Sequence, residues 1–253
     1  MFERKKFEHL FEGTVHPSKI IGNVYFVGCI PASSHLIDTG EGLILIDTGY
    51  EDTLFMLIDS IYRLGFSPYD IQYIIHSHWH SDHTASTKAL AFLTGAKTMI
   101  GEKDAEKVSQ FFTPDVLLKD GDIVTLGNTE IEIMETPGHT LGTISFFLNV
   151  SEEGKTYRVG MFGGAGANTL VRGAFDYDTC REDYRSSLNK LRQQKVDVFI
   201  GNHVWNNDTE NKIKILLQTN ENRFIDNTLW MEFLDFCERR LDEIIKSEEN
   251  GNP

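Results

Sequence analysis

The residues best suited to chemistry lie close together, in the segment His76-Ser-His78-Trp-His80-Ser-Asp82-His83. Side chains two positions apart in an extended chain point the same way, so His78 and His80 can reach one ion together. Where the chain turns into the helix expected next, Asp82 and His83 face a neighbouring point. Imidazole nitrogens and carboxylate oxygens are the ligands that Zn²⁺ prefers, so this spacing predicts a zinc site rather than a polar surface turn.

Two further histidines follow predicted strands. His139 lies in Thr-Pro-Gly-His-Thr, and His203 lies in Gly-Asn-His. A single loop histidine is ordinarily a solvated side chain, but here the 76–83 segment alone offers too few ligands for a complete centre. Because open α/β sheets place their sites where strands end, we expect both rings to join the cluster.

With these residues the sequence resembles the metallo-β-lactamase fold superfamily, and most closely the third subclass of class B metallo-β-lactamases. The resemblance covers residues 24–241, nearly the whole chain. It is carried by Ile44-Leu-Ile-Asp47-Thr-Gly49, the His78–His83 segment, Asp120-Gly-Asp122, Thr136-Pro-Gly-His139-Thr and the single His203. It implies an α/β fold, the αββα sandwich, built as one domain.

The resemblance also implies a cofactor of two zinc ions per chain. The ligands fall into two groups of three, His78, His80 and His139 for the first ion and Asp82, His83 and His203 for the second. Asp82 would also be the catalytic carboxylate, which orients a metal-bridging hydroxide. Asp47 resembles the superfamily's supporting aspartate, which orients metal ligands, although a strand-end turn would equally explain an aspartate at this position.

The implied reaction is hydrolysis of an amide or ester in a small-molecule substrate, which we expect to be cyclic and β-lactam-like. A lactonase or thioesterase of the same fold is the alternative, because the same hydroxide would serve it. An electron-transfer scaffold of this fold normally has a carboxylate where His80 stands, together with a flavin partner. A purely structural zinc site is closed and rich in cysteine. Neither description matches these residues.

Three departures separate the expected substrate pocket from that of the third subclass and its relatives. Most hydrolases of the superfamily have a metal-bridging aspartate where this sequence has Gly163-Gly164, although the third subclass also lacks it. The hydroxyl-bearing residues that bind the β-lactam carboxylate in that subclass have no match in Gly164-Ala-Gly-Ala-Asn168, and no His-Pro follows His203. We expect the glycines to form a tight turn that needs positive φ, not a phosphate-binding loop.

Several neighbouring side chains have more than one interpretation. His76 lies outside the motif, and we expect it to pack or to support the site rather than bind metal. Trp79 and Trp205 flank expected ligands, and each side chain could either line the substrate pocket or pack against the rest of the protein. The loop 172–184, with its charged stretch 176–182, either covers the cleft or is a solvated surface.

The elements that would position these residues follow from periodicity and turn signals. Apolar runs predict ten strands, at 23–27, 35–38, 42–47, 71–75, 97–100, 122–126, 130–135, 143–150, 156–162 and 196–200. Apolar residues at helical spacing predict helices at 54–64, at 84–93, after residue 101, at 181–193, and twice after residue 200. Two packed sheets flanked by helices are the expected architecture. No linker divides residues 1–253, which predicts one domain with loose ends at about 1–12 and 248–253.

The composition is that of an ordinary globular chain, with 40% hydrophobic and 25% charged residues. The net charge of −14, from 24 basic and 38 acidic residues, argues against nucleic acid as a partner or substrate. Three cysteines without paired spacing favour a reducing compartment. Because no secretory or membrane-spanning segment is visible, we expect a cytoplasmic protein without a membrane partner.

Overall fold

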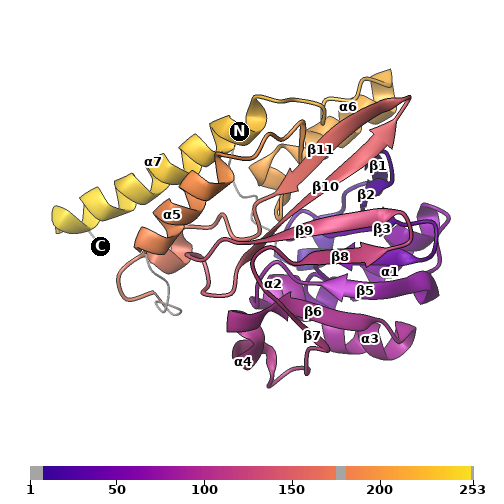
Figure 1. Cartoon of the computed structure of the whole chain (residues 1–253), viewed down its shortest axis with the longest axis horizontal. Helices are drawn as coiled ribbons and strands as arrows, with labels where there is room; N and C mark the ends of the chain where they lie inside the picture. Colours follow the sequence, from indigo (N-terminus) through magenta and orange to yellow (C-terminus); the bar gives the residue numbers. More distant parts are fainter. Residues whose placement is uncertain (1–7, 175–180, 252–253) are drawn as a thin grey trace.

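The computed structural model describes residues 8–174 and 181–251. Our expectations for residues 1–7, for 175–180 of the charged loop and for 252–253 lie outside the described part. Within it, the chain forms two mixed β-sheets that pack face to face, with helices on both outer faces (Figure 1). This arrangement is the predicted αββα sandwich, in a single domain.

The seven-stranded sheet begins as a meander and continues with parallel strands. Its strands, in chain and spatial order, are β1 (Ser18–Ile21), β2 (Val24–Phe26), β3 (His35–Asp38), β4 (Leu43–Ile46), β5 (Ile71–Ile75), β6 (Lys97–Gly101) and β7 (Val116–Leu118). Neighbours from β1 to β4 are antiparallel, whereas neighbours from β4 to β7 are parallel. Because parallel strands end at the same edge of a sheet, the segments that follow β4, β5 and β6 emerge together.

The five-stranded sheet has the spatial order β12-β11-β10-β9-β8. Its strands are β8 (Ile123–Leu126), β9 (Thr129–Glu135), β10 (Ile144–Glu152), β11 (Lys155–Met161) and β12 (Val198–Phe199). Strands β8 to β11 pair antiparallel, and β12 is parallel to β11. The chain therefore leaves β11 and β12 at one edge, toward Gly163 and His203.

Helices cover the outer faces of both sheets. The α-helices of the described residues are α1 (Leu54–Arg63), α2 (Ser81–Thr84), α3 (Thr87–Thr94), α4 (Ala105–Val108), α5 (Arg181–Leu191), α6 (Thr209–Thr219) and α7 (Leu229–Glu249). Helices α1 and α3 pack on the seven-stranded sheet, and α5 and α7 pack on the five-stranded sheet. None of these helices, within the described residues, is long and apolar enough to cross a membrane.

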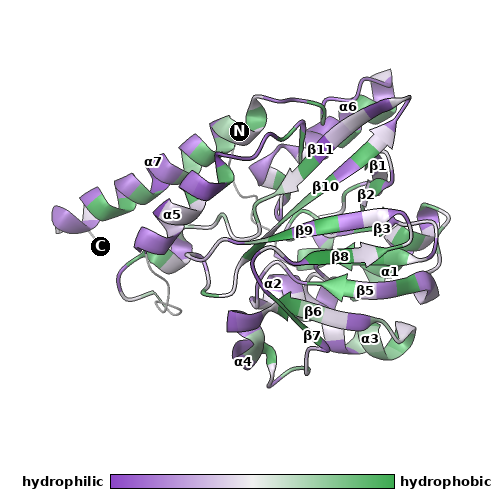
Figure 2. Ribbon diagram, in the orientation of Figure 1, coloured by the Kyte–Doolittle hydropathy of each residue, from purple (hydrophilic) through white to green (hydrophobic). Residues whose placement is uncertain are grey.

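Alternating apolar side chains explain why each sheet is covered on both faces. In β4, Ile44 and Ile46 face the other sheet, whereas Leu43 and Leu45 pack with α1 and α3. Helix α7 shows alternating polar and apolar bands along its length, as a helix with one buried face should (Figure 2). A sheet that is apolar on both faces has to be covered twice, which produces the four layers.

Most predicted elements are present, and the differences have local causes. Strands β1 and β7 have no counterpart among the predicted strands, because these short edge strands give too little alternation to recognise. The helix predicted at 84–93 is divided into α2 and α3. The division occurs because the N–H and hydroxyl of Ser86 donate to the carbonyls of Gly49 and Tyr50. The helix after residue 101 is limited to the single turn η4 (Glu102–Asp104) and α4.

Phe146 of β10 packs between the two sheets, so its substitution tests how much this layer of the core contributes to stability. Its side chain is 0% exposed, whereas that of Phe92 on α3 is 94% exposed. Phe146→Ala should lower the free energy of unfolding by about 3–5 kcal/mol, because it leaves a cavity between the sheets. Phe92→Ala should change it by less than about 0.5 kcal/mol. Urea unfolding of both variants measures the difference, and equal losses would contradict the layer assignment.

Candidate metal centre

Three imidazole rings converge where the loops after β5 and β9 meet. Nε2 of His78 lies 3.2 Å from Nε2 of His139, which in turn lies 3.0 Å from Nδ1 of His80. Two nitrogen ligands of a tetrahedral zinc ion lie about 3.3 Å apart at ordinary zinc–nitrogen distances. The three nitrogens therefore have the spacing of ligands to one ion and could hold a metal.

A second group lies beside the first and consists of Asp82, His83 and His203. Oδ2 of Asp82 lies 3.5 Å from Nε2 of His83 and 3.7 Å from Nε2 of His203. One donor atom each from His78, Asp82 and His83 fits within 4.8 Å, so the two groups adjoin at His78. The structure thus brings all six side chains singled out in the sequence to one place.

Four of the rings are held by a hydrogen bond at Nδ1, on the side opposite Nε2. The acceptors are Gly163 O for His78 (2.9 Å), Gly166 O for His139 (2.6 Å), Pro31 O for His203 (3.0 Å) and Asp47 Oδ2 for His83 (2.7 Å). Because these oxygens only accept, Nδ1 of each ring carries a proton and Nε2 faces the cluster. Nε2 of His83 is buried and has no hydrogen-bond partner. Leaving such an acceptor unpaired costs free energy, and a bound metal ion would satisfy it.

Asp47 connects this arrangement to the end of β4. Its Oδ1 accepts the backbone N–H of Ser77 at 2.7 Å, and its Oδ2 accepts both the Ser77 hydroxyl and His83 Nδ1, each at 2.7 Å. The residue has a φ of 60°, which is uncommon for aspartate and costs free energy. These contacts show that Asp47 supports the 76–83 segment, which is the first of the two roles that the sequence allows for it.

Burial and neighbouring charges shift the pKa values of the cluster in different directions. Burial, reinforced by the neighbouring His80, lowers the pKa of His139 to about 3. Burial would raise the pKa of Asp82, but the charges of His83 and His203 outweigh it and lower this pKa to about 2. Burial also disfavours protonation of His83, yet the carboxylates of Asp82 and Asp47 raise its pKa to about 9. A metal ion that binds at His83 therefore has to displace a proton.

Comparison with known protein families agrees with this geometry. The model of the metallo-β-lactamase superfamily matches residues 27–203, which is more than half of the chain. The chain belongs to the metallo-β-lactamase superfamily. Its two-sheet sandwich, with the cluster at the strand ends, is the fold of that superfamily.

Solved structures of similar fold include subclass B3 metallo-β-lactamases. BJP-1 of Bradyrhizobium japonicum is 28% identical, with a TM-score of 0.87 over 94% of this chain and 96% of that one. Native FEZ-1 of Legionella gormanii is 30% identical, with a TM-score of 0.85 over 92% of this chain and 96% of that one. The resemblance to the third subclass that the sequence suggests is thus confirmed at the level of structure.

Curated relatives match over shorter stretches. A hydroxyacylglutathione hydrolase of Chelativorans sp. is 32% identical over 103 residues, which are 41% of this chain and 37% of that protein. An N-acyl homoserine lactonase of Bacillus sp. is 25% identical over 154 residues, which are 49% of this chain and 61% of that protein. The chain thus matches less than two thirds of the length of either relative.

In this member of the superfamily the cluster opens into a cleft of about 1040 Å³. Trp79 and Trp205 both line it, each against a ring of the cluster. Trp79 meets His80 at an angle, with centroids 4.7 Å apart, and Trp205 stacks on His203 at 4.1 Å. The other walls come from Phe111, from residues 165–174 and from one side of α7. The described part of the 172–184 loop therefore borders the cleft at residues 172–174.

The glycine-rich turn after β11 corrects one expectation. Gly163, Gly164 and Gly166 have no positive φ, so the prediction of a turn that needs positive φ is wrong. A Cβ atom on Gly164 would lie 2.7 Å from Thr143 Cγ2 and 2.8 Å from His139 Cβ. Glycine is required there because the backbone approaches the His139 loop closely, and this approach lets carbonyls of the turn reach the ligand rings.

His76 stays outside the cluster, in agreement with its predicted role. It is buried, its Nε2 lies 3.1 Å from the Thr87 hydroxyl, and its ring packs 5.4 Å from that of Phe112. Asp104, which is not among the residues that the sequence singles out, accepts hydrogen bonds from the loops that carry the first group. A single acidic residue in a polar stretch has no spacing signal that could have identified it.

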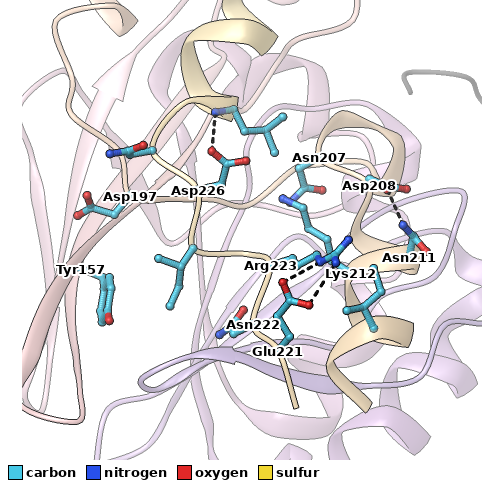
Figure 3. Close-up of a pocket in the computed structure, with 14 residues that line it drawn as sticks. Tyr157, Asp197, Asn207, Asp208, Asn211, Lys212, Glu221, Asn222, Arg223 and Asp226 are labelled. Atoms are coloured by element: carbon cyan, nitrogen blue, oxygen red, sulfur yellow. Dashed lines mark hydrogen bonds and ion pairs between the residues drawn. The ribbon is translucent and has the colours of Figure 1, made fainter. Parts of the chain in front are cut away.

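A second hollow, of about 700 Å³, lies away from the cluster, between α6 and residues 221–229 (Figure 3). Its polar groups already serve the local backbone: Asp226 Oδ1 accepts the N–H of Thr228, and Asn222 donates to the carbonyl of Ile20. The Lys212 ammonium is buried there, 5.6 Å from the centroid of the Phe224 ring. In the part of the chain that the structure describes, this hollow contains no group of three candidate metal ligands.

His35 of β3 supports the turn that precedes His203. Its Nε2 donates to the carbonyl of Gly201 at 3.0 Å, and its Nδ1 is buried without a hydrogen-bond partner. Burial lowers the pKa of His35 from 6.5 to about 4, against smaller opposing effects of Gly201 and Asp47. Between these two values the unfolded chain binds a proton that the folded chain excludes.

The metal-free protein should therefore lose stability as the pH falls from 6.5 through 4, and His35 should account for up to about 3 kcal/mol of this loss. His35→Gln keeps a donor for Gly201 but does not titrate, so its unfolding free energy should fall less steeply with acid. Denaturant titrations at several pH values measure the slope, with His9→Gln at an exposed position as control. An unchanged slope in His35→Gln would contradict the assignment.

Proposed function

We propose that the protein is a zinc-dependent hydrolase that binds two zinc ions and cleaves an amide or ester bond in a small, cyclic, β-lactam-like substrate. The observation that carries this proposal is the buried Nε2 of His83, which has no hydrogen-bond partner and lies 3.5 Å from Asp82 Oδ2. It lies in a group of donor atoms from His78, Asp82 and His83 that fits within 4.8 Å. Imidazole nitrogens and a carboxylate gathered at one buried point are what a zinc site requires, and in the metal-free protein a proton on His83 takes the place of the cation.

The donor set suits zinc, since it combines five imidazoles with one carboxylate. In this proposal His78, His80 and His139 hold the first ion, and Asp82, His83 and His203 hold the second. When bound, the ions polarise a carbonyl of the substrate and lower the pKa of water so that hydroxide is available at neutral pH. Asp47, Gly163, Gly166 and Pro31 orient the rings from behind.

Asp82 is the catalytic carboxylate of the proposal. Its pKa near 2 keeps it ionised at neutral pH, so one of its oxygens can accept a hydrogen bond from the attacking water and orient it. Trp79, Trp205 and the side of α7 that faces the cleft supply apolar walls. These walls exclude bulk water and hold the unreactive part of the substrate.

Two observations support a β-lactam-like substrate over other esters and amides. The subclass B3 structures resemble nearly the whole chain, and Gly164 brings no carboxylate between the two ligand groups. The curated relatives named as a hydroxyacylglutathione hydrolase and an N-acyl homoserine lactonase support the alternative, a thioesterase or lactonase. Both versions use the same metal ligands, so substrate comparison separates them.

The two ligand groups lead us to expect close to two zinc ions per chain by elemental analysis. Chelation should abolish hydrolysis, and added zinc should restore it, because the water is activated by the metal. Equilibrium dialysis followed by metal analysis measures the ratio. Protein that stays metal-free in zinc-supplemented buffer would end the proposal.

Single substitutions should separate the two groups. His139→Ala should weaken the first ion and His203→Ala the second, each with a loss of activity by orders of magnitude. His76→Ala is the matched control: it removes a buried ring from the same segment but should keep both ions and most activity. Zinc content and turnover are measured for all three variants. Loss of an ion from His76→Ala, with none from His203→Ala, would contradict the ligand assignment.

The absence of a carboxylate at Gly164 leaves the proposed ion pair more electrophilic than in relatives with a bridging aspartate. This favours charge that develops on a carbonyl oxygen or lactam nitrogen over a phosphodiester that is already anionic. Because residues 164–168 offer no hydroxyl for the β-lactam carboxylate, an activated cephalosporin should be opened detectably but with a high KM. A bis-aryl phosphodiester should be cleaved more slowly. Steady-state rates at equal enzyme and zinc decide between them, and faster phosphodiester cleavage would remove the lactamase-like assignment.

A further inference from the structure

One buried carboxylate outside the cluster joins the two loops that carry the first ligand group. Asp104 ends η4, directly after β6, and is 1% exposed. Its Oδ2 accepts the backbone N–H of Trp79 at 3.1 Å and the hydroxyl of Thr140 at 2.7 Å. Its Oδ1 accepts the backbone N–H of Gly142 at 2.8 Å. Both oxygens are therefore fully engaged.

The donors to Asp104 lie next to ligands in the sequence. Trp79 stands between His78 and His80, and Thr140 follows His139. The two loops come from different sheets, the first after β5 and the second after β9. A single side chain from a third segment thus fixes the distance between the two loops that supply the first group.

Close packing of glycine against the same residue supports this interpretation independently. A Cβ atom on Gly142 would lie 2.3 Å from the backbone nitrogen of Asp104 and 2.6 Å from its Cγ. A Cβ atom on Gly101 would lie 2.1 Å from the carbonyl oxygen of Gly142. The second loop is therefore seated directly on the backbone around η4, with no room for a side chain between them.

We propose that Asp104 is a positioning residue for the first ion: it holds the His78–His80 segment and the His139 loop at the separation that one ion requires. This inference rests on the proposed function, because it concerns the affinity of that metal site. The second group is fixed by other contacts, through Asp47 to His83 and through Pro31 to His203. Loss of Asp104 should therefore affect the two ions unequally.

Asp104→Asn is the sharpest substitution because it changes almost no volume. Three donors point at two carboxylate oxygens, whereas an amide offers one oxygen and an NH₂ group that cannot accept. The NH₂ group of the amide must then face one of the three donors, so at least one loop loses its hydrogen bond to residue 104. Thr140→Val removes the hydroxyl, which contacts Asp104 Oδ2 and, at 2.8 Å, the Thr143 hydroxyl. It leaves both backbone contacts of Asp104 in place, which makes it a milder variant of the same connection.

The experiment titrates metal-free protein with zinc in competition with a chromophoric chelator, and with Co²⁺ to follow the visible absorption of the low-coordinate site. Asp104→Asn should weaken the first ion by about 10- to 100-fold, the usual effect of losing a group that orients metal ligands, and change the second much less. Thr140→Val should weaken it less. The double variant should lose no more than Asp104→Asn alone if both act through one contact.

Asp115→Asn is the matched control. Asp115 also accepts a backbone N–H and a hydroxyl, both from Thr98 at 2.8 and 2.9 Å, but it is exposed and touches neither ligand loop. It should leave both affinities at wild-type values. Hydrogen exchange of the Trp79 and Gly142 amides in metal-free protein reports whether the loops are released, independently of any metal.

The outcomes are distinguishable. Faster exchange at these amides together with selective loss of the first ion supports the inference. Faster amide exchange with both zinc affinities unchanged would overturn the inference. Equal weakening of both zinc affinities would overturn it too, because either result is expected of a carboxylate that only stabilises the fold. Wild-type protein that binds neither zinc nor Co²⁺ would refute the proposed function itself, and the role of Asp104 with it.

Discussion

Hydrogen bonding at Nδ1 determines what the centre can bind. Four rings donate from Nδ1 to an oxygen behind them, so their Nε2 atoms are turned toward the cluster. The oxygens come from three turns of the two sheets: Pro31 lies between β2 and β3, Asp47 follows β4, and Gly163 and Gly166 follow β11. The orientation of the rings thus depends on the sheets staying packed together, and the apolar core between them serves the site directly.

This dependence explains where the structure accepts unfavourable local geometry. Asp47 is held at a φ of 60°, fully buried, yet its carboxylate receives three donors. The turn after β11 has no side chains at Gly163 and Gly164, and its backbone can therefore lie against the His139 loop. In both places an unfavourable backbone conformation or the loss of a side chain accompanies fixed positions of the ring nitrogens in the cluster.

The sequence was informative where residue type carries the signal. The spacing of His78 to His83 and the apolar strand periodicity predicted a cluster at strand ends between two sheets, and the structure has both. It was uninformative where backbone atoms make the contacts. The carbonyls of Pro31, Gly163 and Gly166 are present in every residue type, so only the tertiary fold shows that they lie against the rings. Asp104 escaped notice for a related reason, because its partners are two backbone N–H groups and one hydroxyl from distant loops.

In the proposed dizinc form, the charge at the centre would differ in sign from the charge on the whole chain. The chain carries a net −14, but surface charges more than about 8 Å away are largely screened at physiological salt. In the proposed dizinc form, two divalent ions would meet one direct carboxylate, Asp82, with Asp47 one ring behind. Gly164 adds no further negative charge. Walls that include Trp79, Trp205 and Phe233 lower the local dielectric, so this positive charge would act with little screening on an oxygen that becomes negative in the proposed reaction. The net negative charge of the chain therefore does not exclude an anionic small molecule from the cleft. The cleft walls carry few cationic side chains, however, so a carboxylate of that molecule would form few direct ion pairs with them.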